Sequence, residues 1–113
     1  MAVHFQSNNP TALLSDFKKK IDQKHIVTWS YTKDGDFTHA TDQWKNKAWL
    51  RPSISSNQLI LSIVKPQGQL VSREVYGIYQ GRFIESMLTH CYSLFTNGSA
   101  TALASGSDIV SAA

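Results

Sequence analysis

The amino-acid sequence predicts an α+β fold: a two-layer sandwich in which an N-terminal and a C-terminal helix cover one face of a four-stranded antiparallel meander. Three observations support this class. Apolar residues recur at helical spacing near both ends of the chain, and they alternate with polar residues between. The links between the alternating runs are short, which favours antiparallel neighbours. Leu59–Val64 is apolar at nearly every position, which indicates a central strand.

The N-terminal residues show two patterns in succession. Val3 and Phe5 alternate with polar neighbours, which fits either a short edge strand or an untethered terminus. Asn9 is then expected to cap a helix with Pro10 at its first position, where a missing N–H group costs nothing. This helix is expected to run to about Lys24, on an apolar stripe of Leu13, Leu14, Phe17 and Ile21.

Three strands are expected in the middle of the chain. His25–Tyr31 alternates with period two, and Asp34-Gly35 after it is a hairpin signal. Phe37–Arg51 is long for one strand and its alternation is interrupted, so we expect a bulge or a short dividing loop. Pro52 is expected to end or border this strand. The central strand follows.

The second helix is expected after one more strand. Leu70–Tyr79 alternates again and is interpreted as the fourth strand. A helix is then expected from near Gly81, with Asn97-Gly98 as its stop signal. Its apolar stripe comprises Phe83, Ile84, Met87, Leu88, Cys91, Leu94 and Phe95.

The composition is that of one small globular unit. The chain has 113 residues, 42% of them hydrophobic and 17% charged, which supports a single core. We expect one compact domain over residues 1–98 and a flexible Ser/Ala/Gly-rich tail over residues 99–113. No apolar run is long enough to cross a membrane and no secretory signal is present, so a cytoplasmic location is expected.

Nothing in the sequence points to catalysis or to a cofactor. The single cysteine, Cys91, excludes a disulfide within the chain, and its place on a helix stripe indicates inert packing. Asp34, Asp36, His39 and Asp42 lie close together in sequence but lack the spacing of a calcium loop. We therefore expect a protein that is not an enzyme and binds no metal or cofactor.

Aromatic residues are the first candidate site. Three Trp and four Tyr in so short a chain exceed what one sheet face and two helices readily absorb, and protein interfaces are enriched in such residues. If both helices cover one face, the other face is open to a partner. The expected protein interface comprises Trp29, Tyr31, Trp44, Trp49 and Tyr76.

Basic residues around one tryptophan are the second candidate site. On an exposed strand, cations hold phosphates while an aromatic ring stacks on a base. The net charge of +3 is only mildly favourable to this reading. The expected nucleic-acid site comprises Lys45, Lys47, Trp49, Arg51 and Arg73.

The expected function is therefore that of a small non-enzymatic protein-interaction or accessory module. Its simplest form is a homodimer formed through an open aromatic sheet face, because a two-fold contact needs one self-complementary patch. Two alternatives stay open: binding of single-stranded nucleic acid through the basic strand, and binding of a small ligand in a pocket between sheet and helices.

Overall fold

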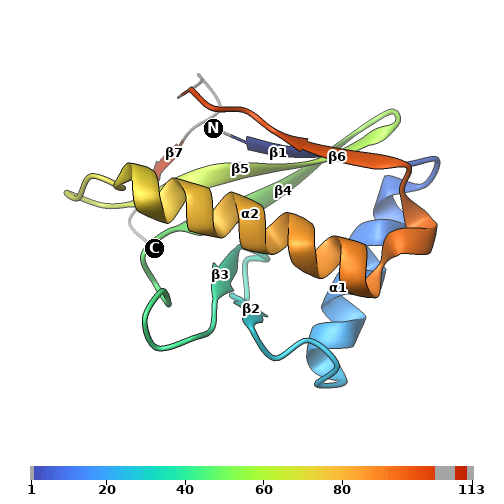
Figure 1. Ribbon diagram of the computed structural model, residues 1–113, viewed down its shortest axis with the longest axis horizontal. Coiled ribbons are helices and arrows are strands. Elements are labelled where there is room, and N and C mark those ends of the chain that lie inside the picture. Colours follow the sequence, from blue (N-terminus) through green and yellow to red (C-terminus); the bar gives the residue numbers. More distant parts are fainter. Residues whose placement is uncertain (1, 104–108, 112–113) are drawn as a thin grey trace.

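The computed structural model describes residues 2–103 and 109–111, which form a small α+β domain with two helices and a curled six-stranded antiparallel sheet (Figure 1). The strands lie in the order β2-β3-β4-β5-β1-β6, and β7 pairs in parallel with the far part of β5. The elements are β1 (Ala2–Gln6), α1 (Pro10–Asp22), β2 (Trp29–Tyr31), β3 (Phe37–His39), β4 (Trp49–Ser55), β5 (Gln58–Pro66), α2 (Arg73–His90), the 3₁₀ turn η1 (Tyr92–Leu94), β6 (Asn97–Ala100) and β7 (Ile109–Ser111).

The strand β5 is central, as its apolar run predicts. It pairs with β4 on one side and with β1 on the other. Leu59, Leu61 and Ile63 enter the core, while Ile60 and Ser62 alternate with them and lie on the opposite face. The period of two therefore divides β5 into a core side and an outer side.

The strand β1 is interior, so the expectation of an edge strand or an untethered terminus is wrong. Val3 pairs with Leu61 of β5 on one side and with Ala100 of β6 on the other. Val3 and Phe5 are fully buried. Gly98 crosses Phe5 so closely that a Cβ atom there would lie 2.9 Å from its ring. The pairing of β1 with β5 and of β6 with β1 makes six antiparallel strands where a four-stranded meander was expected.

Leu70–Tyr79 is not a strand, because α2 begins at Arg73. The side chain of Ser72 accepts a hydrogen bond from the Val75 N–H group at 3.2 Å, which caps the helix. The helix ends at His90, and Asn97-Gly98 belongs to β6 instead of ending a helix. The predicted helix therefore starts too late and ends too late.

The segment Phe37–Arg51 is divided more deeply than a bulge would require. After β3, residues 42–46 form turns, and the backbone of Asn46 is left-handed with φ of 59°. Strand β4 continues through Pro52, which pairs with Leu61. Beyond Leu50, β4 has no partner in β3, so a proline without a donor is tolerated there.

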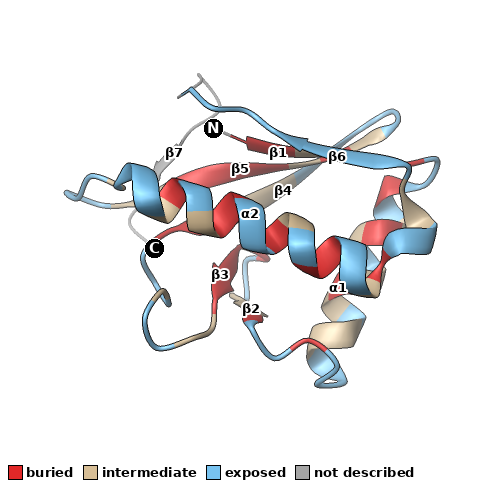
Figure 2. Cartoon of the chain, viewed as in Figure 1, coloured by how far each residue is buried: buried red, intermediate tan, exposed pale blue. Residues whose placement is uncertain are grey.

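Both helices pack on one face of the sheet, as expected. Leu13 and Phe17 of α1 and Tyr79, Phe83 and Met87 of α2 share a core with the inward residues of β1, β3, β4 and β5. Phe17 and Phe83 have ring centroids 4.7 Å apart, which joins the two helices above the sheet. Figure 2 shows buried and exposed stretches alternating along α2.

The predicted boundary between the domain and its tail falls inside a strand. Ser99 and Ala100 form the second half of β6, and residues 101–103 continue from it. Residues 104–108 and 112–113 lie outside the described part of the chain, so the tail prediction is not addressed there.

Candidate binding surface

The face of the sheet opposite the helices is the main candidate. Its residues alternate with the core residues along each strand, so they follow from the same period of two. No helix of the described residues contributes to this surface, because the side chains of α1 and α2 pack on the other face. We call it the outer surface: Ala2, His4 and Gln6 of β1, Arg51, Ser53 and Ser55 of β4, and Gln58, Ile60 and Ser62 of β5. Trp49 and Val64 continue the same alternation but are buried, so the open part of this face lies around Ile60.

A hollow of about 370 Å³ lies within the outer surface. That volume is near the lower end of the range of roughly 300 to 1,000 Å³ typical of ligand pockets. Its floor includes buried Ala2 and Ser62, while Leu103 at its rim is 72% exposed. The residues that line it are Ala2, His4, Ser53, Ile60, Ser62, Thr101 and Leu103.

The lining combines apolar atoms with short hydrogen-bonding groups. Hydroxyl groups come from Ser53, Ser62 and Thr101, and the imidazole of His4 lies 3.2 Å from the Gln58 amide oxygen. No Asp, Glu, Lys or Arg is among the described lining residues. Such a lining suits a neutral group with an apolar body and a polar tip.

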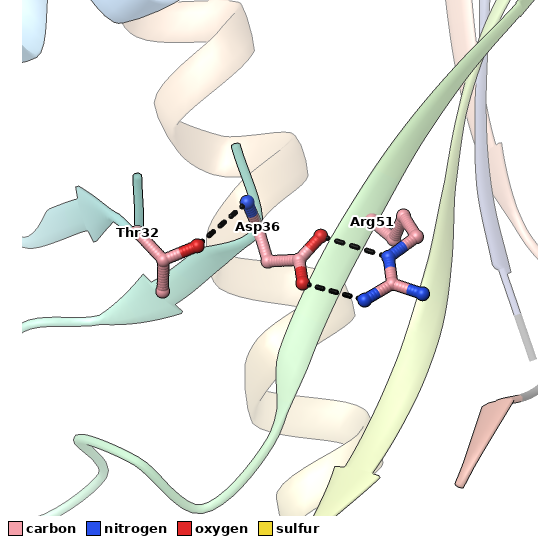
Figure 3. A network of polar contacts seen from close by, with 3 residues as sticks. All are labelled: Thr32, Asp36 and Arg51. Carbon is pink, nitrogen blue, oxygen red and sulfur yellow. Dashed lines mark hydrogen bonds and ion pairs between the residues drawn. The ribbon is translucent and has the colours of Figure 1, made fainter. Parts of the chain in front are cut away.

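An ion pair between half-exposed Arg51 of this surface and buried Asp36 lies at its border (Figure 3). Arg51 donates from Nε and Nη2 to the carboxylate of Asp36, at 3.0 and 2.8 Å. Asp36 is buried, and its own N–H group donates to the Thr32 hydroxyl at 3.2 Å. The bond to Asp36 raises the pKa of Arg51 above its ordinary value. Each charge neutralises the other, so the pair fastens the β2–β3 hairpin to β4.

The predicted aromatic interface is mostly core. Trp29 is 2% exposed, and Trp49 and Tyr76 are each 8% exposed. Trp29 packs its ring against Phe83 of α2 at 5.1 Å between centroids, on the helix side of the sheet. Trp29 and Tyr76 belong to the core, whereas Trp49 is buried on the outer side of β4, two residues before Arg51. Trp29, Trp49 and Tyr76 are therefore not exposed rings, and a protein interface built on the five residues stays a prediction.

The other two aromatic residues of that set are half-buried. Tyr31 packs against the core and donates its hydroxyl to Asp22 at 2.6 Å. Trp44 also packs against the core, and its carbonyl oxygen accepts a hydrogen bond from the buried Tyr79 hydroxyl. Their contacts fasten the ends of β2 and the 42–46 turns to the domain.

The predicted basic site is dispersed over different elements. Lys45 and Lys47 are exposed in the turn region before β4, not on a strand, and Lys45 lies 3.6 Å from Asp42. Arg51 is paired with Asp36, while Arg73 donates to the Ala102 carbonyl oxygen at 3.2 Å from the start of α2. With Trp49 buried, the stacking platform is absent from this set. Nucleic-acid binding stays an untested prediction.

Cys91 and Lys20 lie in structural settings away from the outer surface. Burial raises the pKa of the Cys91 thiol to about 12, so the thiolate is scarce near neutral pH. Lys20 donates to Asp16 at 2.9 Å and also to the His90 carbonyl oxygen, which ties α1 to the end of α2. Within residues 2–103 and 109–111, no three potential ligands gather as a metal site.

Two further findings concern the chain as a whole. No helix among the described residues is long and apolar enough to cross a membrane. A scan against family models, a search of curated proteins and a search of solved structures found no match to this chain.

The residues of the hollow escaped sequence reasoning, although one signal for them was present. Ser53, Ser55 and Ser62 alternate with residues of the opposite face along β4 and β5. Such alternation marks a face that does not enter the core. His4 and Thr101 carried no comparable signal, because their neighbours in the sheet come from distant parts of the chain.

Proposed function

We propose that this protein is a non-enzymatic interaction module that binds a partner on the outer surface of its sheet. The observation that carries the proposal is the hollow beside Ile60, on the face that the two helices leave free. A sheet with one packed face presents the other face to solvent or to a second molecule. A concave site with a few hydrogen-bonding groups is the usual form of a binding site.

The chemistry of the surface supports binding over catalysis. The hydroxyl groups of the hollow have no adjacent described acid or base to activate them, apart from the His4 ring, which faces Gln58. The buried thiol of Cys91 lies on the core side, away from the outer surface. The surface can orient a partner through hydrogen bonds and accept an apolar side chain.

Self-association through the outer surface is one form of this function. The aromatic residues that first suggested a dimer lie largely in the core, so the support now comes from the face itself. A symmetric contact would bring two outer surfaces together around one two-fold axis. Light scattering over a range of protein concentrations measures whether the mass doubles.

Amide shift mapping by NMR tests the proposal. Fragments that combine a ring or branched chain with one hydroxyl or amide group are titrated into the labelled protein. The expected hits shift the amides of His4, Ser53, Ser62 and Thr101. The smaller hollow of about 170 Å³ beside Asn9 serves as the internal comparison. Hits that gather only at that smaller hollow, or an absence of hits at the outer surface, would refute the proposal.

A further inference from the structure

Among residues 2–103 and 109–111, β6 has no strand on its outer side, so this edge can accept another strand. β6 is the last strand in the order, and its four residues are all exposed (Figure 2). Residues 97–103 contain no charged residue and no proline, the usual devices that keep an edge from pairing. The opposite edge, β2, is only three residues long, which is itself a way to limit pairing.

The directions of the N–H groups along β6 show which of them are free to bond to an added strand. Thr101 donates its N–H group to the Ala2 carbonyl oxygen at 2.9 Å, so it points toward β1. Because successive N–H groups on a strand alternate, the N–H groups of Ala100 and Gly98 point away from the sheet. After β6 the Thr101 and Ala102 carbonyl oxygens accept from Gln80 and Arg73 of α2. Strand addition is therefore confined to β6 itself.

The hollow begins at the same edge. Ser99 pairs with His4, and Thr101 bonds to Ala2, so these residues lie on one face with the hollow. Thr101 and Leu103 form the rim of the hollow nearest the edge, and Ile60 and Ser53 lie deeper in the sheet. A strand added beside β6 would direct alternate side chains to the outer surface.

We propose that the partner is an extended, uncharged peptide segment that adds a strand to β6 and places one side chain in the hollow. This inference rests on the outer surface being the binding face. Only another extended backbone meets a row of outward N–H and C=O groups, which identifies the partner as a strand. The neutral lining selects an apolar side chain with a polar tip, since a charged group there would lose water without gaining a partner.

A displayed library of short random peptides is selected on the intact protein, and the enriched peptide is synthesised with a fluorescent label. Its affinity is measured by anisotropy for the chain and for four variants. Ala100→Pro removes an outward N–H group without removing a bond to β1, and Ala100→Ser is its control. Ser53→Trp fills the hollow, and Ser55→Trp is its control on the same strand and face.

The expected result is a loss of about tenfold or more in affinity for Ala100→Pro and for Ser53→Trp, and about twofold or less for both controls. Circular dichroism verifies that each variant is folded. In the labelled protein, the amides of Ala100 and Gly98 should become protected from exchange when the peptide binds.

Three outcomes would overturn the inference, and they differ in whether they also contradict the proposed binding face. If Ser53→Trp lowers the affinity of the peptide but Ala100→Pro does not, the outer surface stays the binding face and strand addition is refuted. If none of these variants lowers the affinity, both proposals are refuted. If the selection enriches no peptide, while fragments still shift the amide signals of the outer surface, only the proposal of a peptide partner is refuted.

Discussion

The ion pair between Arg51 and Asp36 is a structural contact in which the two side-chain charges cancel each other. Asp36 is almost completely shielded, whereas the side chain of Arg51 is 41% exposed. Removing one partner of such a pair leaves the other without its ion-pair contact. The loss in the free energy of unfolding then depends on whether the remaining group can reach water. The two positions should therefore respond unequally to truncation.

Truncation of the pair gives the first prediction. Arg51→Ala leaves a buried carboxylate without its donor and should lower the free energy of unfolding by roughly 2 to 4 kcal/mol. Asp36→Ala leaves an arginine that can turn to water and should cost less, on the order of 1 to 2 kcal/mol. Urea unfolding measures both. Asp42→Ala, which removes the exposed partner of Lys45, should be without measurable effect. Equal losses at positions 36 and 51 would contradict this account of the pair.

His39 gives a prediction about pH. Burial, with a smaller effect of Arg82, holds its pKa below the ordinary value of 6.5. The Thr41 hydroxyl and N–H group lie against its Nδ1, and its Nε2 finds no partner among the described residues. The unfolded chain therefore takes up the proton first, and stability is full above about pH 6.5 and declines as the pH falls below it.

The measurement compares the chain with His39→Gln by urea unfolding between neutral and mildly acidic pH. The stability of the chain should decline more steeply, by at most about 1.4 kcal/mol per pH unit, which is the limit for one proton. Trp29 lies 4.9 Å from His39 between ring centroids, so its fluorescence reports the same region. Parallel stability curves for the two proteins would show that His39 does not contribute.

At the scale of elements, the start of α2 fits two periodicities at once, that of a strand and that of a helix. Val71, Val75 and Tyr79 share one face of a strand, yet they are also four residues apart, which is the spacing of a helix face. The cap at Ser72 and the acidic Glu74 in the first turn favour the helix. The cap is a local signal, so it was readable from the sequence.

The cap at Ser72 gives the third prediction. Ser72→Ala removes the hydrogen bond to the Val75 N–H group and should cost about 1 kcal/mol in the free energy of unfolding. Ser72→Asp should retain the cap and serves as the control. Thermal unfolding followed by circular dichroism measures both variants. If Ser72→Asp were as unstable as Ser72→Ala, the capping explanation would fail.

The whole molecule shows which parts of the fold the sequence determines locally. The central position of β5 followed from its apolar run, and the placement of both helices on one face followed from the order of the expected elements. The pairing of β1 with β6 did not, because Val3 and Ala100 lie at opposite ends of the chain. Local periodicity shows that a segment is a strand, but it does not show which distant strand pairs with it.

The candidate site was predictable only in its general position. The expectation that function lies on the sheet face away from the helices is retained as a proposal, while three of the five aromatic residues chosen for it are buried. Large aromatic residues are common interface anchors, but Trp29 and Tyr76 are buried in the core of this domain. The small residues of the hollow gave a weaker signal.

Both proposals require the outer surface of the sheet to be open to solvent around Ile60, while the opposite face is packed. A soluble gadolinium chelate broadens the methyl signals of groups that solvent reaches, so it tests this claim on the chain without a ligand. We predict strong broadening for Ile60 and Leu103 and little for Leu59 and Leu61, which lie on the core side. If Ile60 and Leu103 were as protected as Leu61, the outer surface would be covered in solution and the proposed binding face would be contradicted.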